Sequence, residues 1–406
     1  MLGWLSRDGK TLLTVRPLQS FSASFVSIFI AVYLNLIGVP LWQIGVVLTA
    51  GLLASTIFNT AAGFLADRMG RRRMLIFFGL LTVFSGVVFA TLTNPIILVL
   101  VAVVSSLGYR GGLGPAQTLE RVILAQSCPD ERRTRMYAIR STLNSAAVSA
   151  GSLFAGLVVV LQSRFGLAPG ASYRWMFWIY ALLNGVAVVL YLLLSEAAEV
   201  EQARVEALPL SPETRKNVTK LSLLFSVDSL GGGFVTHSLV SYWFFDRFGL
   251  DMDAIGLIFA SSSFLAALSF MLAAWISERI GLINTMVYSH LPANLMTMSI
   301  PWMPNLSASS SIYVGRSLLA QMDVPTRQSY VMAIVEPEER SRVAGIINLP
   351  RSLTSALGPS IAGFMMQFLG SSLPFLFAGG LKAAYDLALY FMFRNVKPPE
   401  ESVNGS

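Results

Sequence analysis

Cysteine and histidine are nearly absent from this sequence. The 406 residues include one cysteine, Cys128, and two histidines. A single cysteine forms no disulfide within one chain and builds no cysteine-based metal site. Charged residues are also scarce, at 13% of the chain, where a soluble domain carries roughly 25%. The composition therefore excludes a disulfide framework and argues against a water-soluble domain.

Long polar segments are missing as well, and apolar runs of about 20 residues, the length that crosses a bilayer, recur along the chain. Hydrophobic residues make up 54% of the sequence. The sequence therefore predicts an all-α polytopic membrane protein. Twelve transmembrane helices are expected, at residues 17–38, 43–66, 74–92, 95–125, 136–163, 174–195, 218–245, 253–277, 282–303, 307–335, 341–369 and 372–394.

The basic residues are spread over short loops between these runs. The formal charge is +7, but with this distribution we expect the lipid bilayer as a partner and no nucleic acid. One side has only Arg164, Arg174 and Arg247, and the other side has most of the arginines and lysines. The richer side is expected to be cytoplasmic. We therefore expect a monomeric, multi-pass protein of the cell membrane with both termini inside.

The longest polar stretch, SEAAEVEQARVEALPLSPETRKN, divides the chain. It predicts a six-helix half at 1–194, a cytoplasmic linker at 195–217 and a second six-helix half at 218–406. Paired sequences support a duplication: PDERR and PEERS, GFLADRMGRRR and AWISERIGLIN, GSLFAG and GPSIAG. YRGGLGPAQTLER at 109 also aligns with GRSLLAQMDVPTR at 315. Such a repeated unit is common in transporters.

The stretch GFLADRMGRRR resembles the signature loop of the major facilitator superfamily. The residues that carry the resemblance and form a candidate conformational latch are Gly63, Asp67, Arg68, Gly70 and Arg71. The resemblance, to bacterial and archaeal proton-coupled members, implies two pseudo-symmetric six-helix bundles around a central cavity. It also implies that Asp67 holds the two halves together in one conformation. The alternative is that the arginines only fix topology and Asp67 is a solvated loop acid.

Two further motifs resemble the same superfamily in part. Arg110 and Gly114 in RGGLGPA match its fourth-helix motif, but Leu113 replaces the usual glutamine. By this resemblance, Arg110 is a candidate for proton coupling. GSLFAG and GPSIAG resemble the antiporter motif and favour export. Their small residues also have a simpler explanation, because they let helices pack closely.

Charges at membrane depth need a partner or a watery cavity. Arg316, Asp323 and Arg327 fall on one face of an ideal helix, and so do their counterparts Arg110, Gln117 and Arg121. The resemblance places both helices along the cavity. Arg110 then has three alternatives. It bonds backbone carbonyls, it reaches Asp228 or Asp323, or it meets an anionic substrate.

Three other polar features lie within the predicted spans. Lys382 and Asp386 are four residues apart and are expected to form a structural pair. Asp228 precedes three glycines at 231–233, which predict either a bend next to a protonation site or a close helix crossing. His237 and His290 are expected to be packed polar residues, with a proton role as the alternative.

These patterns indicate a secondary transporter of a small solute. No nucleotide-binding motif is present, so we expect an ion gradient, most simply protons, to supply the energy. We expect no enzymatic activity, cofactor or metal. The leading hypothesis is proton-coupled export of a small organic molecule by alternating access. One alternative is uptake or exchange of an organic anion held between Arg110 and Arg316. A non-transporting membrane sensor or scaffold is the alternative of another class.

Overall fold

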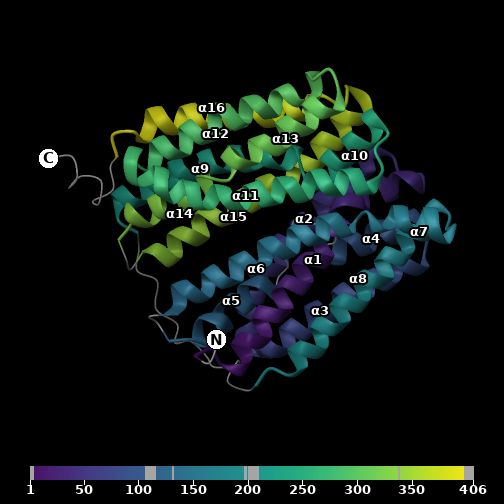
Figure 1. The fold of residues 1–406 in the computed structure, drawn as a ribbon. Coiled ribbons are helices and arrows are strands. Elements are labelled where there is room, and N and C mark those ends of the chain that lie inside the picture. The colour runs from purple at the N-terminus through teal and green to yellow at the C-terminus, as the bar shows by residue number, and fades with distance from the viewer. Residues whose placement is uncertain are drawn as a thin grey trace. The chain divides into compact units, whose positions relative to one another are not determined.

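A computed structural model describes residues 4–105, 116–129, 132–195, 199, 210–336 and 339–396. The described residues are helical and contain no strand (Figure 1). The helices are α1 (Arg7–Leu36), α2 (Leu41–Met69), α3 (Arg71–Thr91), α4 (Pro95–Ser105), α5 (Ala116–Gln126), α6 (Arg133–Phe154), α7 (Leu157–Phe165), α8 (Pro169–Leu192), α9 (Pro212–Phe234), α10 (His237–Phe248), α11 (Met252–Ile280), α12 (Leu282–Ser299), the short 3-10 helix η3 (Ile300–Trp302), α13 (Leu306–Ala320), α14 (Asp323–Ala333), α15 (Arg340–Phe368) and α16 (Leu373–Phe393).

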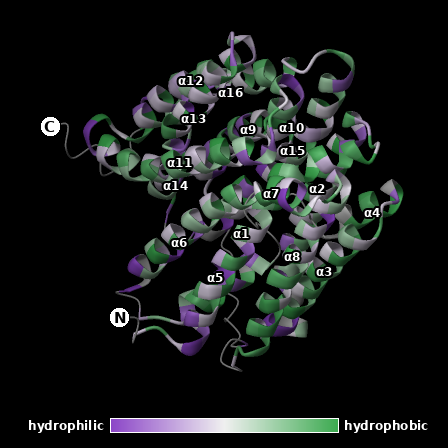
Figure 2. Ribbon diagram, turned by 45° about the vertical axis from the view of Figure 1, so that its right-hand side comes forward, coloured by the Kyte–Doolittle hydropathy of each residue, from purple (hydrophilic) through white to green (hydrophobic). Residues whose placement is uncertain are grey.

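Hydrophobic residues are spread along most of these helices (Figure 2), and many large apolar side chains are exposed. Leu182, Met271 and Phe391 are each more than 60% exposed, as expected for helix faces that contact lipid rather than water. Eight helical stretches of the described chain are long and apolar enough to cross a bilayer. They are Arg7–Leu36, Leu41–Ala62, Arg71–Thr91, Arg135–Phe165, Pro169–Leu192, Thr214–Phe248, Met252–Ile280 and Leu373–Phe393.

The chain divides into two compact units. Unit 1 comprises 1–203 and 236–260, and unit 2 comprises 204–235 and 261–406. This grouping differs from the division predicted from the linker, because α10 and the start of α11 belong with unit 1. Their contacts explain the grouping. Helix α10 packs against α1, where the Ser238 hydroxyl donates to the Ser27 carbonyl at 2.6 Å.

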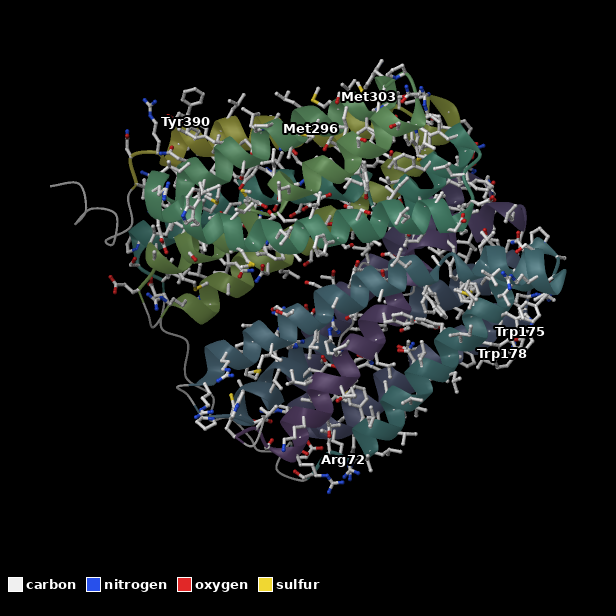
Figure 3. All side chains as sticks on the ribbon, viewed as in Figure 1. Arg72, Trp175, Trp178, Met296, Met303 and Tyr390 are labelled. Atoms are coloured by element: carbon white, nitrogen blue, oxygen red, sulfur yellow. The ribbon has the colours of Figure 1, made fainter. Side chains whose placement is uncertain are left out.

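Each unit has its own core. In unit 1, α1 and α8 interlock through aromatic rings, with Phe29 lying 5.3 Å from Phe177 and 5.4 Å from Tyr173 between ring centroids. Trp175 and Trp178 are exposed near the start of α8, and Arg72 lies at the opposite end of unit 1 (Figure 3). Tryptophan at one helix end and arginine at the other is typical of a membrane span. In unit 2, α9, α12, α15 and α16 surround a core that includes buried aromatic side chains.

Among the predicted spans that the structure describes throughout, three are interrupted. The span predicted at 136–163 is divided at Ala155–Gly156, the span at 218–245 at Val235–Thr236, and the span at 307–335 at Gln321–Met322. The last break separates Arg316 on α13 from Asp323, the first residue of α14. The prediction that Arg316, Asp323 and Arg327 share one face of a continuous helix is therefore wrong.

The triple glycine after Asp228 lies in continuous helix, and α9 ends just beyond it at Phe234. A Cβ atom on Gly233 would lie 2.9 Å from Gly358 Cα, and a Cβ on Gly231 would lie 3.0 Å from the Ala378 carbonyl oxygen. The glycines therefore allow α9 to approach α15 and α16 closely. The sequence predicts either a bend or a close helix crossing in this segment. The structure has a close crossing at the glycines and, within five residues, the end of α9.

Candidate functional site

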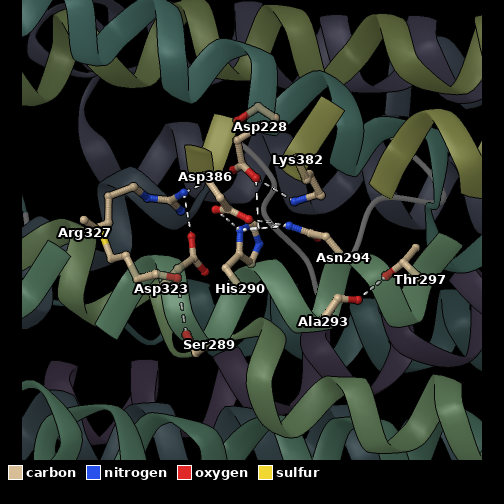
Figure 4. Close-up of polar contacts among 12 residues, drawn as sticks. Asp228, Ser289, His290, Ala293, Asn294, Thr297, Asp323, Arg327, Lys382 and Asp386 are labelled. Carbon is tan, nitrogen blue, oxygen red and sulfur yellow. Dashed lines mark hydrogen bonds and ion pairs between the residues drawn. The ribbon is translucent and has the colours of Figure 1, made fainter. Parts of the chain in front are cut away.

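Six ionisable side chains meet inside unit 2, and we name them the acid–base cluster. They come from α9, α12, α14 and α16, helices that pack against one another. Its members are Asp228, His290, Asp323, Arg327, Lys382 and Asp386 (Figure 4). The three carboxylates are each at most 5% exposed. Burial of this much charge is costly without partners, so the contacts of each group define the site.

Asp228 is the centre of the cluster and receives a cation on each oxygen. Lys382 Nζ donates to Asp228 Oδ1 at 2.7 Å, and Arg327 Nη1 donates to Asp228 Oδ2 at 3.1 Å. Arg327 Nη1 also lies 2.9 Å from Asp323 Oδ2. The arginine therefore joins a carboxylate on α9 to one on α14, and the lysine joins α9 to α16.

His290 lies between two carboxylates. Its Nδ1 is 2.9 Å from Asp386 Oδ1, and its Nε2 is 3.9 Å from Asp228 Oδ1. Asn294, one turn further along α12, donates from Nδ2 to Asp386 Oδ2 at 2.8 Å. With Asp386 ionised, Nδ1 of His290 must carry a hydrogen, because a carboxylate only accepts. In the neutral ring, Nε2 then has a lone pair and can take up a proton.

Permanent cations balance the carboxylates of this cluster. Arg351 lies at its margin, where Nε donates to the Ser229 hydroxyl at 3.2 Å. Arg327 and Arg351 both lie over the ring of Phe225, at 5.3 and 5.8 Å from its centroid. With neutral His290, the charges of Arg327, Lys382 and Arg351 offset those of the three aspartates. A proton on His290 would leave one cation in excess.

Unit 1 contains a second buried cluster, formed by Arg16, Glu120, Arg140 and Tyr191, which we name the arginine–glutamate cluster. Tyr191 donates to Glu120 Oε1 at 2.5 Å. Glu120 Oε2 lies 3.5 Å from Arg140 Nη2 and 3.9 Å from Arg16 Nη1. Glu120 is 1% exposed and Arg16 is 3% exposed. This cluster therefore holds one carboxylate between arginines on α1 and α6.

Hydrogen bonds reveal the internal repeat in space. In unit 1, the Ser24 hydroxyl on α1 donates to the Val148 carbonyl on α6 at 2.8 Å. In unit 2, the Ser222 hydroxyl on α9 donates to the Ile346 carbonyl on α15 at 3.3 Å. Both bonds join residues 124 positions apart. The first helix of each half thus contacts the fifth in a related way, as the duplicated sequences predict.

Several residues of the predicted latch and cavity stripe lie outside the description. Arg110 falls outside the described residues, as do the side chains of Gly63, Asp67 and Arg68. Gly70 is described, with φ of 90° directly before α3, and Arg71 is buried. The latch and coupling roles of these residues stay predictions.

Gln117 and Arg316, two of the residues predicted to face the cavity, lie in different surroundings. Gln117 is half-buried on α5. Arg316 donates from Nη1 to Thr297 Oγ1 at 3.3 Å and lies 4.8 Å from the Tyr313 ring centroid. Arg316 therefore has contacts on α12 and α13 of its own unit.

The predicted pairing of Lys382 with Asp386 requires a correction. Lys382 contacts Asp228, and Asp386 contacts His290 and Asn294. The close approach of α9 to α16 at Gly231 explains why Lys382 pairs with Asp228 and not with Asp386, because it brings Asp228 within reach of the lysine. His290 was not recognised as a central residue. The spacing of His290, Asn294 and Thr297 puts three polar side chains on one face of α12, a signal that could have indicated it.

The described residues contain no group of three or more His, Cys, Asp and Glu side chains arranged to hold a metal ion. The cluster carboxylates are engaged by lysine, arginine, histidine and asparagine instead. Such groups can exchange protons with one another, and each carboxylate can change its ion-pair partner.

Comparison with known proteins identifies the family. The sequence model of the Major Facilitator Superfamily matches residues 17–322 and 317–406. The chain belongs to the Major Facilitator Superfamily. The predicted architecture of twelve transmembrane helices in two bundles is confirmed by this match and by the structural neighbours of the chain.

Proteins with similar sequences come from yeast and from a bacterium. An uncharacterized membrane protein of Saccharomyces cerevisiae is 26% identical over 425 residues, which is 96% of this chain and 95% of that protein. An uncharacterized MFS-type transporter of Bacillus subtilis, YceJ, is 23% identical over 136 residues, 34% of this chain and 35% of that protein.

Solved structures share the fold at low identity. The nucleoside transporter NupG has a TM-score of 0.75 at 16% identity, with 96% of this chain and 99% of that chain covered. A D-xylose-proton symporter has a TM-score of 0.71 at 15% identity, with 94% and 97% covered. Family and fold together support a role in membrane transport.

Proposed function

We propose that this protein is a secondary transporter that couples proton movement to the export of a small organic molecule across the cell membrane, with both termini cytoplasmic. The observation that carries the proposal is the position of His290 between Asp386 and Asp228. Histidine is the side chain that titrates near physiological pH without perturbation. Here it lies between two buried carboxylates, one on α9 and one on α16. A proton on the ring would therefore change the electrostatic attraction between α12 and these two helices.

The coupling proton binds at Nε2 of His290 in this proposal. Nδ1 donates to Asp386, which fixes the tautomer and leaves Nε2 toward Asp228. Protonation gives Nε2 a hydrogen and turns its contact with Asp228 Oδ1 into an ion pair. A proton therefore strengthens the connection between α12 and α9.

Lys382 and His290 compete for one oxygen atom. Both approach Asp228 Oδ1, Lys382 at 2.7 Å and His290 at 3.9 Å. Because the cluster is balanced with neutral histidine, a proton leaves one cation in excess. Lys382 is the cation best placed to leave, since its side chain is 18% exposed and that of Arg327 is 9% exposed. Proton binding would thus loosen α16 from α9 near the close crossing at Gly231.

Other charged groups around His290 contribute to its field. On the helices packed against α12, these are Asp323, Arg327 and Tyr330 of α14, Arg316 of α13, and Lys382, Tyr385 and Asp386 of α16. Asp228 of α9 is a further member, through its contact with His290. The pH dependence of transport should therefore reflect the titration of the whole cluster. It should shift when any one of these groups is neutralised.

The test uses purified protein in proteoliposomes with an imposed pH gradient. Nucleosides and pentoses, classes taken from the names of two structural neighbours, begin a panel that extends to organic anions and hydrophobic organic molecules. An acidic lumen drives solute accumulation if protons and solute move in opposite directions, as export requires. An acidic exterior drives it if they move together. Accumulation with an acidic exterior alone overturns export, and gradient-independent equilibration overturns proton coupling.

The organic-anion hypothesis makes a different prediction for the same panel. An anion held by Arg110 and Arg316 should exchange across the membrane, and Arg316→Lys should weaken its binding because lysine lacks the planar fork of arginine. Arg316 has partners on α12 and α13, which favours a structural role for it. Absence of flux for the whole panel would instead favour the sensor or scaffold hypothesis.

A further inference from the structure

Gly70, the one residue between α2 and α3, has a backbone arrangement that favours an anion. Gly70 has φ of 90°, a conformation that side-chain-bearing residues rarely adopt. Directly after it, α3 begins, and the first N–H groups of a helix have no partner within the helix. The N–H groups of Arg71 and Arg72 therefore need acceptors from elsewhere in the molecule.

Glu199, in the segment that connects the two six-helix halves, supplies both acceptors. Its Oε2 accepts from the Arg71 N–H at 2.5 Å, and its Oε1 accepts from the Arg72 N–H at 3.0 Å. A Cβ atom at position 70 would lie 2.9 Å from both carboxylate oxygens. Glycine is thus required for the φ angle and for the approach of the carboxylate. One linker side chain satisfies two backbone groups, with the charge that a helix N-terminus favours.

The same corner of unit 1 is tied to two other helices. Arg71 Nη1 donates to Gln126 Oε1 at the end of α5, at 3.2 Å, and Arg72 Nη2 donates to the Leu192 carbonyl at the end of α8. The linker itself is anchored at its start, where Asp8 accepts from the Ser195 N–H at 3.0 Å. Glu199 therefore joins an anchored linker to the start of α3, directly after the signature loop.

We propose that Glu199 is a positioning residue for the signature loop: by clamping the N–H groups of Arg71 and Arg72, it sets the start of α3 and so the placement of the preceding segment that carries Asp67. The proposal rests on the transport function proposed above and gives the linker a part in the conformational equilibrium. Without the clamp, the loop loses its fixed end, and the latch that the sequence predicts for Asp67 weakens.

Two measurements that need no substrate test this proposal. Hydrogen exchange of the α3 amides at 71–76 reports the clamp itself. Distances between spin labels at Arg135 in unit 1 and Glu336 in unit 2, both exposed, report the populations of the conformations. The labels are introduced in a Cys128→Ser background. The variants are Glu199→Gln, Asp67→Asn and their combination, and Glu278→Gln is the control because Glu278 is exposed at the end of α11.

Glu199→Gln keeps the shape of the side chain but offers only one accepting oxygen. We expect amides 71–76 to exchange roughly tenfold faster, and the distance distribution to shift as it does in Asp67→Asn. The combined variant should shift no further than the larger single change, because both act through one loop. Glu278→Gln should match the wild type in both measurements.

Two results would overturn the proposal. Unchanged exchange at 71–76 in Glu199→Gln would mean that the carboxylate does not hold α3. Faster exchange with a wild-type distance distribution, or shifts that add fully in the combined variant, would mean that Glu199 caps the helix without positioning the latch. Both results are independent of solute flux, so failure of the clamp and failure of proton-coupled transport can be told apart.

Discussion

The two halves of the chain bury charge in related places but with different chemistry. The arginine–glutamate cluster of unit 1 has one carboxylate, and its ion pairs are 3.5 and 3.9 Å long. The acid–base cluster of unit 2 has three carboxylates and a histidine, with four ion-pair contacts of 2.7 to 3.1 Å and a fifth, between His290 and Asp228, of 3.9 Å. Arginine stays charged at all physiological pH values. Of these two clusters, the one in unit 2 is therefore suited to exchange a proton.

The first helix of each half shows the same contrast. Ser20 on α1 is bonded to Asn144 on α6, and Ser229 on α9 is bonded to Arg351 on α15. The residue before each serine is neutral Gln19 in unit 1 and charged Asp228 in unit 2. The serine on α1 thus follows a neutral amide, and the serine on α9 follows a carboxylate. We infer that unit 1 stabilises its helices with fixed charge and that unit 2 adds a titratable switch.

The largest effect is expected from Asp228→Asn, which removes the centre of the unit 2 cluster. Lys382 and Arg327 lose the negative charge between them and one of its two accepting oxygens, and breaking a buried ion pair costs about 3–5 kcal/mol. Thermal unfolding of the purified variant should reveal the loss. Asp228→Asn combined with Lys382→Met should recover much of the stability but none of the proton coupling. A single variant as stable as wild type would contradict the central place given to Asp228.

Glu120→Gln applies the same change to unit 1 and sharpens the contrast. Arg16 and Arg140 remain charged without a counter-ion. Because their ion pairs are longer, we expect a cost at the low end of the range for buried pairs, about 3 kcal/mol. Transport should still respond to the pH gradient once protein amount is normalised. Loss of coupling in a well-folded Glu120→Gln protein would place a proton in unit 1 and break the comparison.

Gly233→Ala tests the close crossing that brings Asp228 to its cations. The added methyl would press on Gly358 and on the Ser355 carbonyl, and overpacking costs about 1–3 kcal/mol. Gly185→Ala is the matched control, since its Cβ would meet nothing within 4 Å. Thermal unfolding of the two variants should differ by that amount. Equal stabilities of Gly233→Ala and Gly185→Ala would mean that α9 and α15 can move apart to accept the methyl group at little cost.

Tyr191→Phe should have the smallest effect. It removes one hydrogen bond to Glu120 and costs about 1–3 kcal/mol, toward the lower value because the arginines still offset the carboxylate charge. The same unfolding measurement, with Tyr288→Phe at an exposed position of α12 as control, gives its size. A loss as large as that of Glu120→Gln would show that the tyrosine, and not the arginines, holds the glutamate.

The sequence predicts the helical fold and the duplication, because hydropathy and repeated motifs can be read along the chain, and it singles out Asp228 as a candidate. It does not predict the partners of Lys382. Spacing on one helix favours Asp386, but the glycines of α9 bring Asp228 closer, and this depends on packing between distant segments. For His290 the sequence offers a proton role only as an alternative, because its charged neighbours lie on α9, α14 and α16, and the one local signal is the spacing of His290, Asn294 and Thr297 on α12.

The two histidines of the chain allow the most direct test of the central claim. His290 lies between carboxylates in unit 2, and His237 in unit 1 packs against Phe259 with 4.9 Å between ring centroids. The measurement is pH-gradient-driven solute accumulation in proteoliposomes by His290→Gln and His237→Gln, with gradient-free solute exchange measured on the same samples. His290→Gln should exchange solute but accumulate it to a ratio of about 1, the value for an uncoupled carrier, and His237→Gln should accumulate solute as wild type does. Normal gradient-driven accumulation by His290→Gln would contradict the account.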